Sequence, residues 1–127
     1  MGWKFYNPNP SGNYVGDCVI RALALATGRD WESTYLSVVM QGYDMHDMPA
    51  SNAVWGAFLK SHGWKRYIIP NECPDCYTIK NFAADNPEGL YILATGSHVV
   101  TVKDGFYYDT WDSGNEIPIY FWKREEI

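Results

Sequence analysis

The sequence predicts an α+β fold in which N-terminal helices pack on a C-terminal antiparallel β-sheet. In the first half of the chain, apolar runs with helical spacing alternate with the Gly, Asp and Asn residues that are typical of helix ends. The second half instead has short runs rich in Val, Ile, Tyr, Phe and Trp, which are typical of strands. A chain of 127 residues has the length of one domain, so we expect residues 1–127 to form a single domain.

Composition argues against several classes of partner. The formal net charge of −5 disfavours nucleic-acid binding, which needs a basic face. No segment reaches the length of a membrane span and the N-terminus lacks a secretory pattern, so we expect no membrane partner. Three cysteines are a poor disulfide framework and favour a reducing compartment, which predicts a cytoplasmic protein.

The first predicted helix covers residues 19–26 and begins beside a cysteine. It follows a loop at residues 6–13 that is dense in Pro, Asn, Ser and Gly. Asp17 is a good N-cap residue and Gly28 a natural stop. Cys18 then lies in the first turn, where free backbone N–H groups and the helix dipole favour a thiolate. The competing explanation is that Cys18 is a buried core residue, as single cysteines on apolar helices commonly are.

Two further helices complete the N-terminal half. Asp30 is the expected N-cap of the second helix, which should end at Gly42. Residues 43–50 are polar and are expected to be irregular. The third helix covers residues 51–63 and ends near Gly63.

The predicted sheet begins after this third helix. Residues 64–70 have the composition of a strand, and residues 78–89 that of a short helix followed by a turn. Four strand-like segments then follow in order: LYILATG, HVVTVK, FYYDTWD and IPIYFW.

An Asp-Gly pair at residues 104–105 predicts a tight hairpin between two of these segments. If these two residues are the whole loop, alternation along the strands places a set of side chains on one face. That set is His98, Val100, Val102, Tyr107, Asp109 and Trp111. His98 and Asp109 are then diagonal neighbours within reach of each other. A slip of one residue would put Asp112 in the place of Asp109.

Together, His98 and Asp109 offer a base for Cys18. A carboxylate beside an imidazole fixes its tautomer and stabilises the imidazolium. A thiolate–imidazolium pair is a competent nucleophile. Taken singly, His98 is also explained as a hydrogen-bonded sheet histidine and Asp109 as a residue that ends a strand. The combination of the three residues favours catalysis.

Three motifs carry this combination, and their order is that of a known superfamily. They are GDCVIRAL around Cys18, GSHVV around His98 and DTWDSG beginning at Asp109. The chain resembles a small bacterial or phage member of the papain-like cysteine peptidase superfamily. The resemblance implies a papain-like fold, with Cys18 as nucleophile at the start of the central helix, His98 as base and Asp109 as the residue that orients it. The superfamily has Asn-Ser-Trp where this chain has Asp109-Thr110-Trp111, which favours Asp109 over Asp112.

The chain departs from the superfamily at the oxyanion hole. The superfamily often places a Gln a few residues before the nucleophile, and no Gln precedes Cys18. Asn13 is the nearest side-chain amide and is the candidate donor, although a role in the turn explains it equally well. The backbone N–H of Cys18 would be the other donor. Arg21, one turn after Cys18, is explained either as the partner of a structural carboxylate or as a substrate contact, and we favour the structural role.

Several other residues have two explanations. Trp55, Tyr107 and Trp111 are candidate walls of a substrate groove, and each is also explained by core packing. Cys73 and Cys76 are expected to be free or loosely paired thiols in a loop, and a zinc site, which would need two more ligands, is the minor alternative. The sequence therefore predicts no metal site and no cofactor.

The function predicted is that of a cysteine peptidase or related amide hydrolase with a Cys18-His98-Asp109 triad, acting on a peptide or isopeptide bond of a protein or peptide substrate. Two alternatives remain at this point. In the first, an amine resolves the acyl-enzyme, which gives transamidation. In the second, the domain binds a protein and catalyses nothing. The fold carries no information about the substrate.

Overall fold

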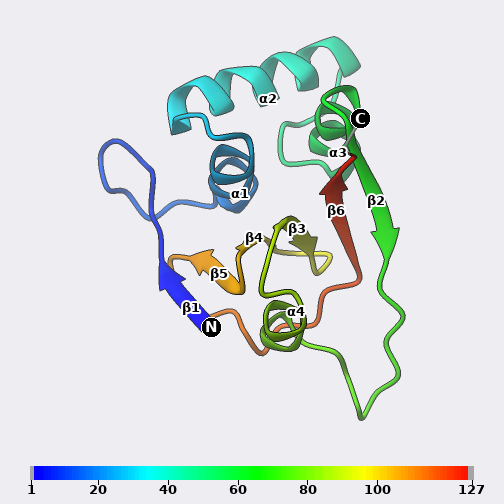
Figure 1. Ribbon diagram of the computed structural model, residues 1–127. Helices are drawn as coiled ribbons and strands as arrows, with labels where there is room; N and C mark the ends of the chain where they lie inside the picture. The colour runs from blue at the N-terminus through cyan, green and yellow to red at the C-terminus, as the bar shows by residue number, and fades with distance from the viewer. Residues whose placement is uncertain (1, 126–127) are drawn as a thin grey trace.

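Helices cover both faces of a six-stranded sheet in the computed structural model, which describes residues 2–125 (Figure 1). The helices are α1 (Cys18–Thr27), α2 (Trp31–Met45), α3 (Asn52–Ser61) and α4 (Ile79–Asp85). The strands are β1 (Gly2–Phe5), β2 (Trp64–Ile68), β3 (Leu90–Ala94), β4 (Val99–Lys103), β5 (Phe106–Asp109) and β6 (Tyr120–Arg124). The predicted α+β class is confirmed.

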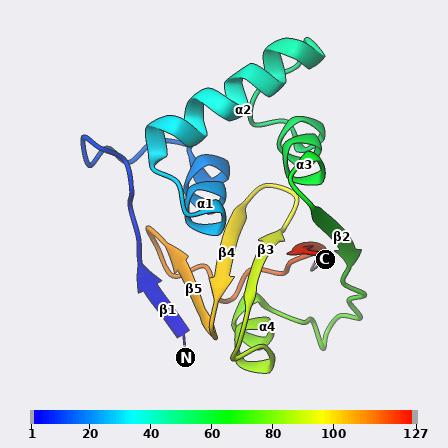
Figure 2. The same ribbon diagram turned by 45° about the horizontal axis from the view of Figure 1, so that its top comes forward.

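The sheet is mixed, so the prediction of an antiparallel sheet is wrong at one edge. The strand order is β1-β5-β4-β3-β6-β2, and β1 runs parallel to β5 while the other neighbouring pairs are antiparallel (Figure 2). Gly2 pairs with Phe106, and Phe5 pairs with Asp109. The sequence did not indicate β1, because four residues before a loop carry too little pattern and their partner strand is distant in the chain.

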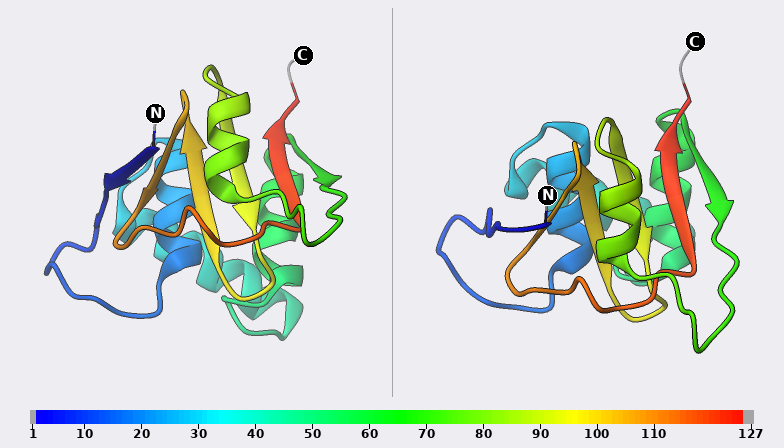
Figure 3. Two further views of the ribbon diagram at one scale, coloured as in Figure 1. Left: turned by 90° about the horizontal axis from the view of Figure 1, so that it is seen from below. Right: turned by 60° about the horizontal axis from the view of Figure 1, so that its bottom comes forward.

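Two apolar clusters hold the layers together. On one face, α1 and α3 pack on the sheet around Leu23, Trp55 and Ile92, and α2 lies outside these two helices. On the other face, α4 covers the sheet around Phe82 and Leu93 (Figure 3). Ile92 and Leu93 are consecutive residues that point to opposite faces, as alternation along a strand requires. Both faces of the central strands are therefore buried.

The ends of α1 and α2 test the predicted stop signals. Gly28 ends α1 with a left-handed φ of 69°, and the Asp30 side chain accepts a hydrogen bond from the Ser33 N–H at 2.7 Å. Both predictions are confirmed. The predicted end of α2 at Gly42 is wrong, because the helix continues to Met45 and a left-handed His46 ends it. A Cβ at Gly42 would lie 2.7 Å from the Asp47 carbonyl oxygen, so the glycine permits a close approach.

The predicted hairpin joins β4 to β5 through Asp104 and Gly105. Both residues have positive φ, 49° and 84°, as a two-residue turn of this hand requires. Lys103 pairs with Phe106, and the ladder extends to the Thr101–Tyr108 pair. The Thr101 hydroxyl donates to the Ala22 carbonyl at 2.7 Å and so fastens β4 to α1.

The prediction that six side chains share one face of this hairpin is wrong in part. Val100, Val102 and Tyr107 pack with α4. His98 and Asp109 instead interact with residues of α1. His98 precedes β4, and Asp109 is the last residue of β5, beyond the last β4–β5 pair, although it still pairs with Phe5 of β1.

Candidate active site

Cys18 is the first residue of α1 and is partly exposed. Within residues 2–125, it is the one cysteine that is not part of a disulfide. Asp17 stands at the N-cap position, as predicted, but its side chain makes no capping hydrogen bond. The Asp17 carboxylate instead accepts hydrogen bonds from Arg21 and from the Trp31 indole N–H, the latter at 2.8 Å. The first turn of α1 therefore presents its N–H groups beside the thiol without a side-chain cap.

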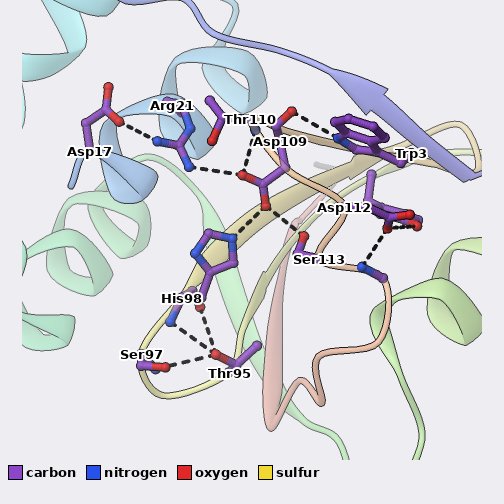
Figure 4. Close-up of polar contacts among 12 residues, drawn as sticks. Trp3, Asp17, Arg21, Thr95, Ser97, His98, Asp109, Thr110, Asp112 and Ser113 are labelled. Carbon is purple, nitrogen blue, oxygen red and sulfur yellow. Dashed lines mark hydrogen bonds and ion pairs between the residues drawn. The ribbon is translucent and has the colours of Figure 1, made fainter. Parts of the chain in front are cut away.

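His98 directly precedes β4 and is held from both its backbone and its ring. The Thr95 hydroxyl accepts the His98 backbone N–H at 3.1 Å, and the Thr95 N–H donates to the His98 carbonyl at 2.9 Å. The imidazole Nε2 lies 2.6 Å from Asp109 Oδ2 (Figure 4). This contact leaves Nδ1 as the ring nitrogen for Cys18.

The Asp109 carboxylate is 1% exposed, and each of its oxygens accepts two hydrogen bonds. Oδ1 accepts from Arg21 Nη2 at 3.0 Å and from the Thr110 N–H at 2.9 Å. Oδ2 contacts His98 and accepts from the Ser113 hydroxyl at 2.7 Å. A carboxylate with this set of donors is fixed in place and stays ionised.

Asp112, the alternative to Asp109, lies elsewhere. Its carboxylate accepts from the Tyr107 hydroxyl and from the Gly114 N–H at 3.1 Å. The structure thus brings Asp109 to His98 and assigns Asp112 to the turn that follows β5.

Electrostatics in the site favour a charged pair. Burial raises the pKa of Cys18, but hydrogen bonds from His98 and from the Val99 backbone, together with the charges of His98 and Arg21, leave it below its usual value. Burial lowers the pKa of His98, but hydrogen bonds with Asp109 and Cys18 raise it to about 9. Burial raises the pKa of Asp109, but the hydrogen bonds from His98 and Ser113 keep it below its usual value. These directions favour the pair of a thiolate and an imidazolium over the pair of a neutral thiol and a neutral imidazole.

Cys18 and His98 open on a cavity of about 530 Å³. Trp111 lines it, is 44% exposed and has its ring 5.0 Å from that of His98, so one predicted groove wall lies at the site. The other two predictions are wrong. Trp55 is 0% exposed and packs in the core against Tyr120, and Tyr107 is 2% exposed and packs on the α4 side. Large rings at these positions fill the core because the residues around them are apolar.

The structure does not place Asn13 in this cavity. Asn13 is an exposed residue of the loop before α1, where its backbone bonds to the Asn7 and Asn9 side chains, and it lines a neighbouring hollow. Asn52, the first residue of α3, lines the cavity instead. The buried Trp55 indole donates to Asn52 Oδ1 at 3.1 Å, which leaves the amide nitrogen as a free donor.

The sequence offered one unused signal for Asn52. An Asn three residues before a Trp at a helix start lies on the same side of the helix, within hydrogen-bond reach. Nothing local connects this position to Cys18, because α3 reaches the cavity only through tertiary packing.

The two remaining cysteines form a pair. Cys73 and Cys76 are joined by a disulfide with a Cα–Cα distance of 4.5 Å, which corrects the expectation of free or loosely paired thiols. They lie between β2 and α4 and do not line the Cys18 cavity. Across residues 2–125, no group of three or more His, Cys, Asp or Glu side chains is arranged to hold a metal ion. None of the helices in this range has both the length and the apolar character needed to cross a bilayer.

Comparison of the chain with protein-family models, with curated proteins and with solved structures finds no match.

Proposed function

We propose that this chain is a papain-like cysteine hydrolase that cleaves a peptide or isopeptide bond in a protein or peptide substrate. The observation that carries the proposal is the arrangement around His98, which hydrogen-bonds with the buried Asp109 carboxylate and lines the same cavity as Cys18. A nucleophile, a base and a residue that orients the base are the three parts that acyl transfer through cysteine requires. The open cavity at Cys18 gives a substrate access to the thiol.

The first half of the reaction forms a thioester. The Cys18 thiolate attacks the carbonyl carbon, and a new S–C bond forms as the carbonyl oxygen becomes negative. His98 then gives its proton to the amide nitrogen, the C–N bond breaks and the amine leaves. Asp109 stays ionised and keeps the imidazole in place throughout.

The second half of the reaction restores the enzyme. Neutral His98 takes a proton from a water molecule, and the hydroxide oxygen attacks the thioester carbon. The S–C bond breaks, so the product leaves as a carboxylic acid and Cys18 leaves as the thiolate. An amine in the place of water would give transamidation by the same steps.

The negative oxygen needs donors that are in position before the reaction starts. The Cys18 backbone N–H at the uncapped start of α1 is one candidate. The Asn52 amide nitrogen is the second, since the Trp55 indole holds the amide in one orientation and Asn52 lines the cavity. Asn52 replaces Asn13 in this role.

The test is hydrolysis of a mixed peptide library, with products identified by mass. We expect cleavage by the wild-type chain, none by Cys18→Ser, and a loss of about a hundredfold or more in Asp109→Ala. Asp112→Ala is the matched control and should retain most of the activity. Products that carry an added amine would show transamidation.

A protein that only binds its partner would give a different result. It would cleave none of the library, and a thiol-directed peptide electrophile would leave Cys18 unlabelled. That pair of results would contradict the proposal.

A further inference from the structure

Arg21 carries a buried charge that the proposed reaction does not use. Its side chain is 7% exposed, and its two terminal nitrogens contact different carboxylates. Nη1 pairs with Asp17, and Nη2 donates to Asp109 Oδ1 at 3.0 Å (Figure 4). A buried guanidinium is tolerated only when it is paired and hydrogen-bonded in this way.

The position of Arg21 in the chain gives these contacts a consequence for the site. Arg21 lies three residues after Cys18 on α1, so a movement of the thiol's helix moves the guanidinium too. Asp109 ends β5 and holds His98. The Arg21–Asp109 contact therefore joins the element that carries the candidate nucleophile to the element that orients the candidate base.

Asp17 holds the other end of the Arg21 guanidinium. It accepts from Arg21 with one oxygen and from the Trp31 indole with the other, at 2.8 Å. Trp31 begins α2, so the polar chain runs from α2 through α1 to the end of β5 and then to His98. A planar fork with two donor ends suits a position between two carboxylates, and a lysine ammonium lacks that geometry.

We propose that Arg21 is a positioning residue of the Cys18–His98 pair, holding Asp109 in register with the nucleophile helix while Asp17 holds the guanidinium. This inference rests on the proposed function and adds a fourth and a fifth residue to the site.

The charges around Arg21 decide what its removal does. The titratable groups that face it are Asp17 on α1, Asp109 on β5 and Tyr6 in the segment after β1, with Cys18 and His98 beyond them. The positive charge of Arg21 favours the Cys18 thiolate, whereas the negative charge of Asp17 opposes it. Removing either partner breaks the same ion pair, but the two removals change the local charge in opposite directions.

The experiment measures the rate of Cys18 alkylation by iodoacetamide as a function of pH, with a thermal melt of each variant. At the pH of the wild-type midpoint, we expect Arg21→Gln to react about two- to fivefold more slowly, because loss of the positive charge raises the pKa of Cys18. Asp17→Asn should shift the midpoint to lower pH, even though both variants melt at lower temperature than wild type. Arg29→Gln, an exposed change of the same charge at the end of α1, should leave the midpoint unchanged.

A second readout follows the base. We expect the downfield imidazole proton signal of the His98–Asp109 hydrogen bond in wild type and Arg29→Gln, and its loss in Arg21→Gln. Arg21→Lys keeps the charge but not the fork, so it should bring the alkylation midpoint back toward wild type without restoring the imidazole signal.

A role in stability alone would lower the melting temperatures without moving the alkylation midpoint. That result, or a shift of both Arg21→Gln and Asp17→Asn in the same direction, would overturn the inference. If Arg21→Gln does not fold, the direction of the Asp17→Asn shift decides alone. Failure of the proposed function is distinct, because wild-type Cys18 would then lack reactivity at acidic pH altogether.

Discussion

At the scale of single residues, the site depends on how fully each charge is paired. Asp109 has two donors on each oxygen, and Arg21 has a carboxylate at each end of its fork. Side chains held in this way lose little freedom when a substrate binds, because their positions are already fixed. Cys18, the candidate nucleophile, is partly exposed and lines the cavity.

The pKa of His98 leads to a prediction about stability and pH. Burial lowers this pKa, but Asp109 and Cys18 raise it to about 9, above the usual value of about 6.5. A group whose pKa is raised by folding stabilises the protein fully below its unfolded pKa, and this stability is lost as the pH rises through the folded pKa. In wild type, the opposite titration of Cys18 offsets this loss, because folding lowers the pKa of the thiol.

We therefore expect the unfolding free energy of Cys18→Ser to fall as the pH rises from about 6.5 to the pKa of His98 in this variant, which lies below 9 because Cys18 no longer raises it. The unfolding free energy of wild type should change little over that range. The measurement is the unfolding free energy from urea titrations at several pH values. The double variant Cys18→Ser/His98→Gln is the control and should show a flat profile. A flat profile in Cys18→Ser itself would mean that Asp109 does not favour the charged form of His98.

At the scale of elements, the ends of one helix and two strands meet at one end of the sheet. They are the start of α1 with Cys18, the residue before β4, which is His98, and the end of β5 with Asp109. The start of α3 closes the cavity with Asn52. Backbone N–H groups at the start of a helix and side chains at strand ends are less committed to regular hydrogen bonding, so the candidate site lies where such groups meet.

This arrangement predicts different roles for two asparagines. Asn52→Ala should lower kcat about a hundredfold, because it removes a donor to the oxyanion, and should change KM little. Asn13→Ala should stay near wild type, because Asn13 lies in an exposed turn outside the cavity. The kinetics of a cleaved peptide measure both variants. Equal effects, or a larger effect at Asn13, would reassign the donor.

At the scale of the whole molecule, the sequence predicted the features that depend on residues close together in the chain. The Asp104-Gly105 turn set the hairpin register, and with it the proximity of His98 and Asp109. Strand β1 was missed because its partner lies about a hundred residues away. Trp55 was predicted to line a groove because the sequence alone does not distinguish a Trp in a groove wall from a Trp in the core.

Contacts between distant segments determine which side chains are buried and which groups they hydrogen-bond. This also explains two other differences between the predicted and the observed helix ends. Asp17 has the residue type of a helix cap, but Arg21 and Trp31 compete successfully for its oxygens. Gly42 has the residue type of a helix stop, but it serves a close approach to the turn that follows α2.

Strand β1 leads to a prediction about stability. The Trp3 indole N–H donates to the Asp109 carbonyl at 3.0 Å and so ties the first strand to the end of β5. Trp3→Phe should lower the unfolding free energy by about 1 kcal/mol, the usual contribution of one hydrogen bond. The Tyr6 N–H still reaches the same carbonyl at 2.9 Å, so the strand should stay paired. A urea titration measures the change, and no change would mean that the indole contact contributes nothing to stability.

The most direct test of the central claim compares Cys18 alkylation in wild type and in His98→Ala across pH. If His98 holds Cys18 as a thiolate, wild type still reacts with iodoacetamide at mildly acidic pH, and His98→Ala reacts only as the pH approaches about 8.5, the usual pKa of a cysteine. Identical profiles in the two folded proteins would contradict the account, because Cys18 would then be an ordinary thiol that happens to lie beside a histidine.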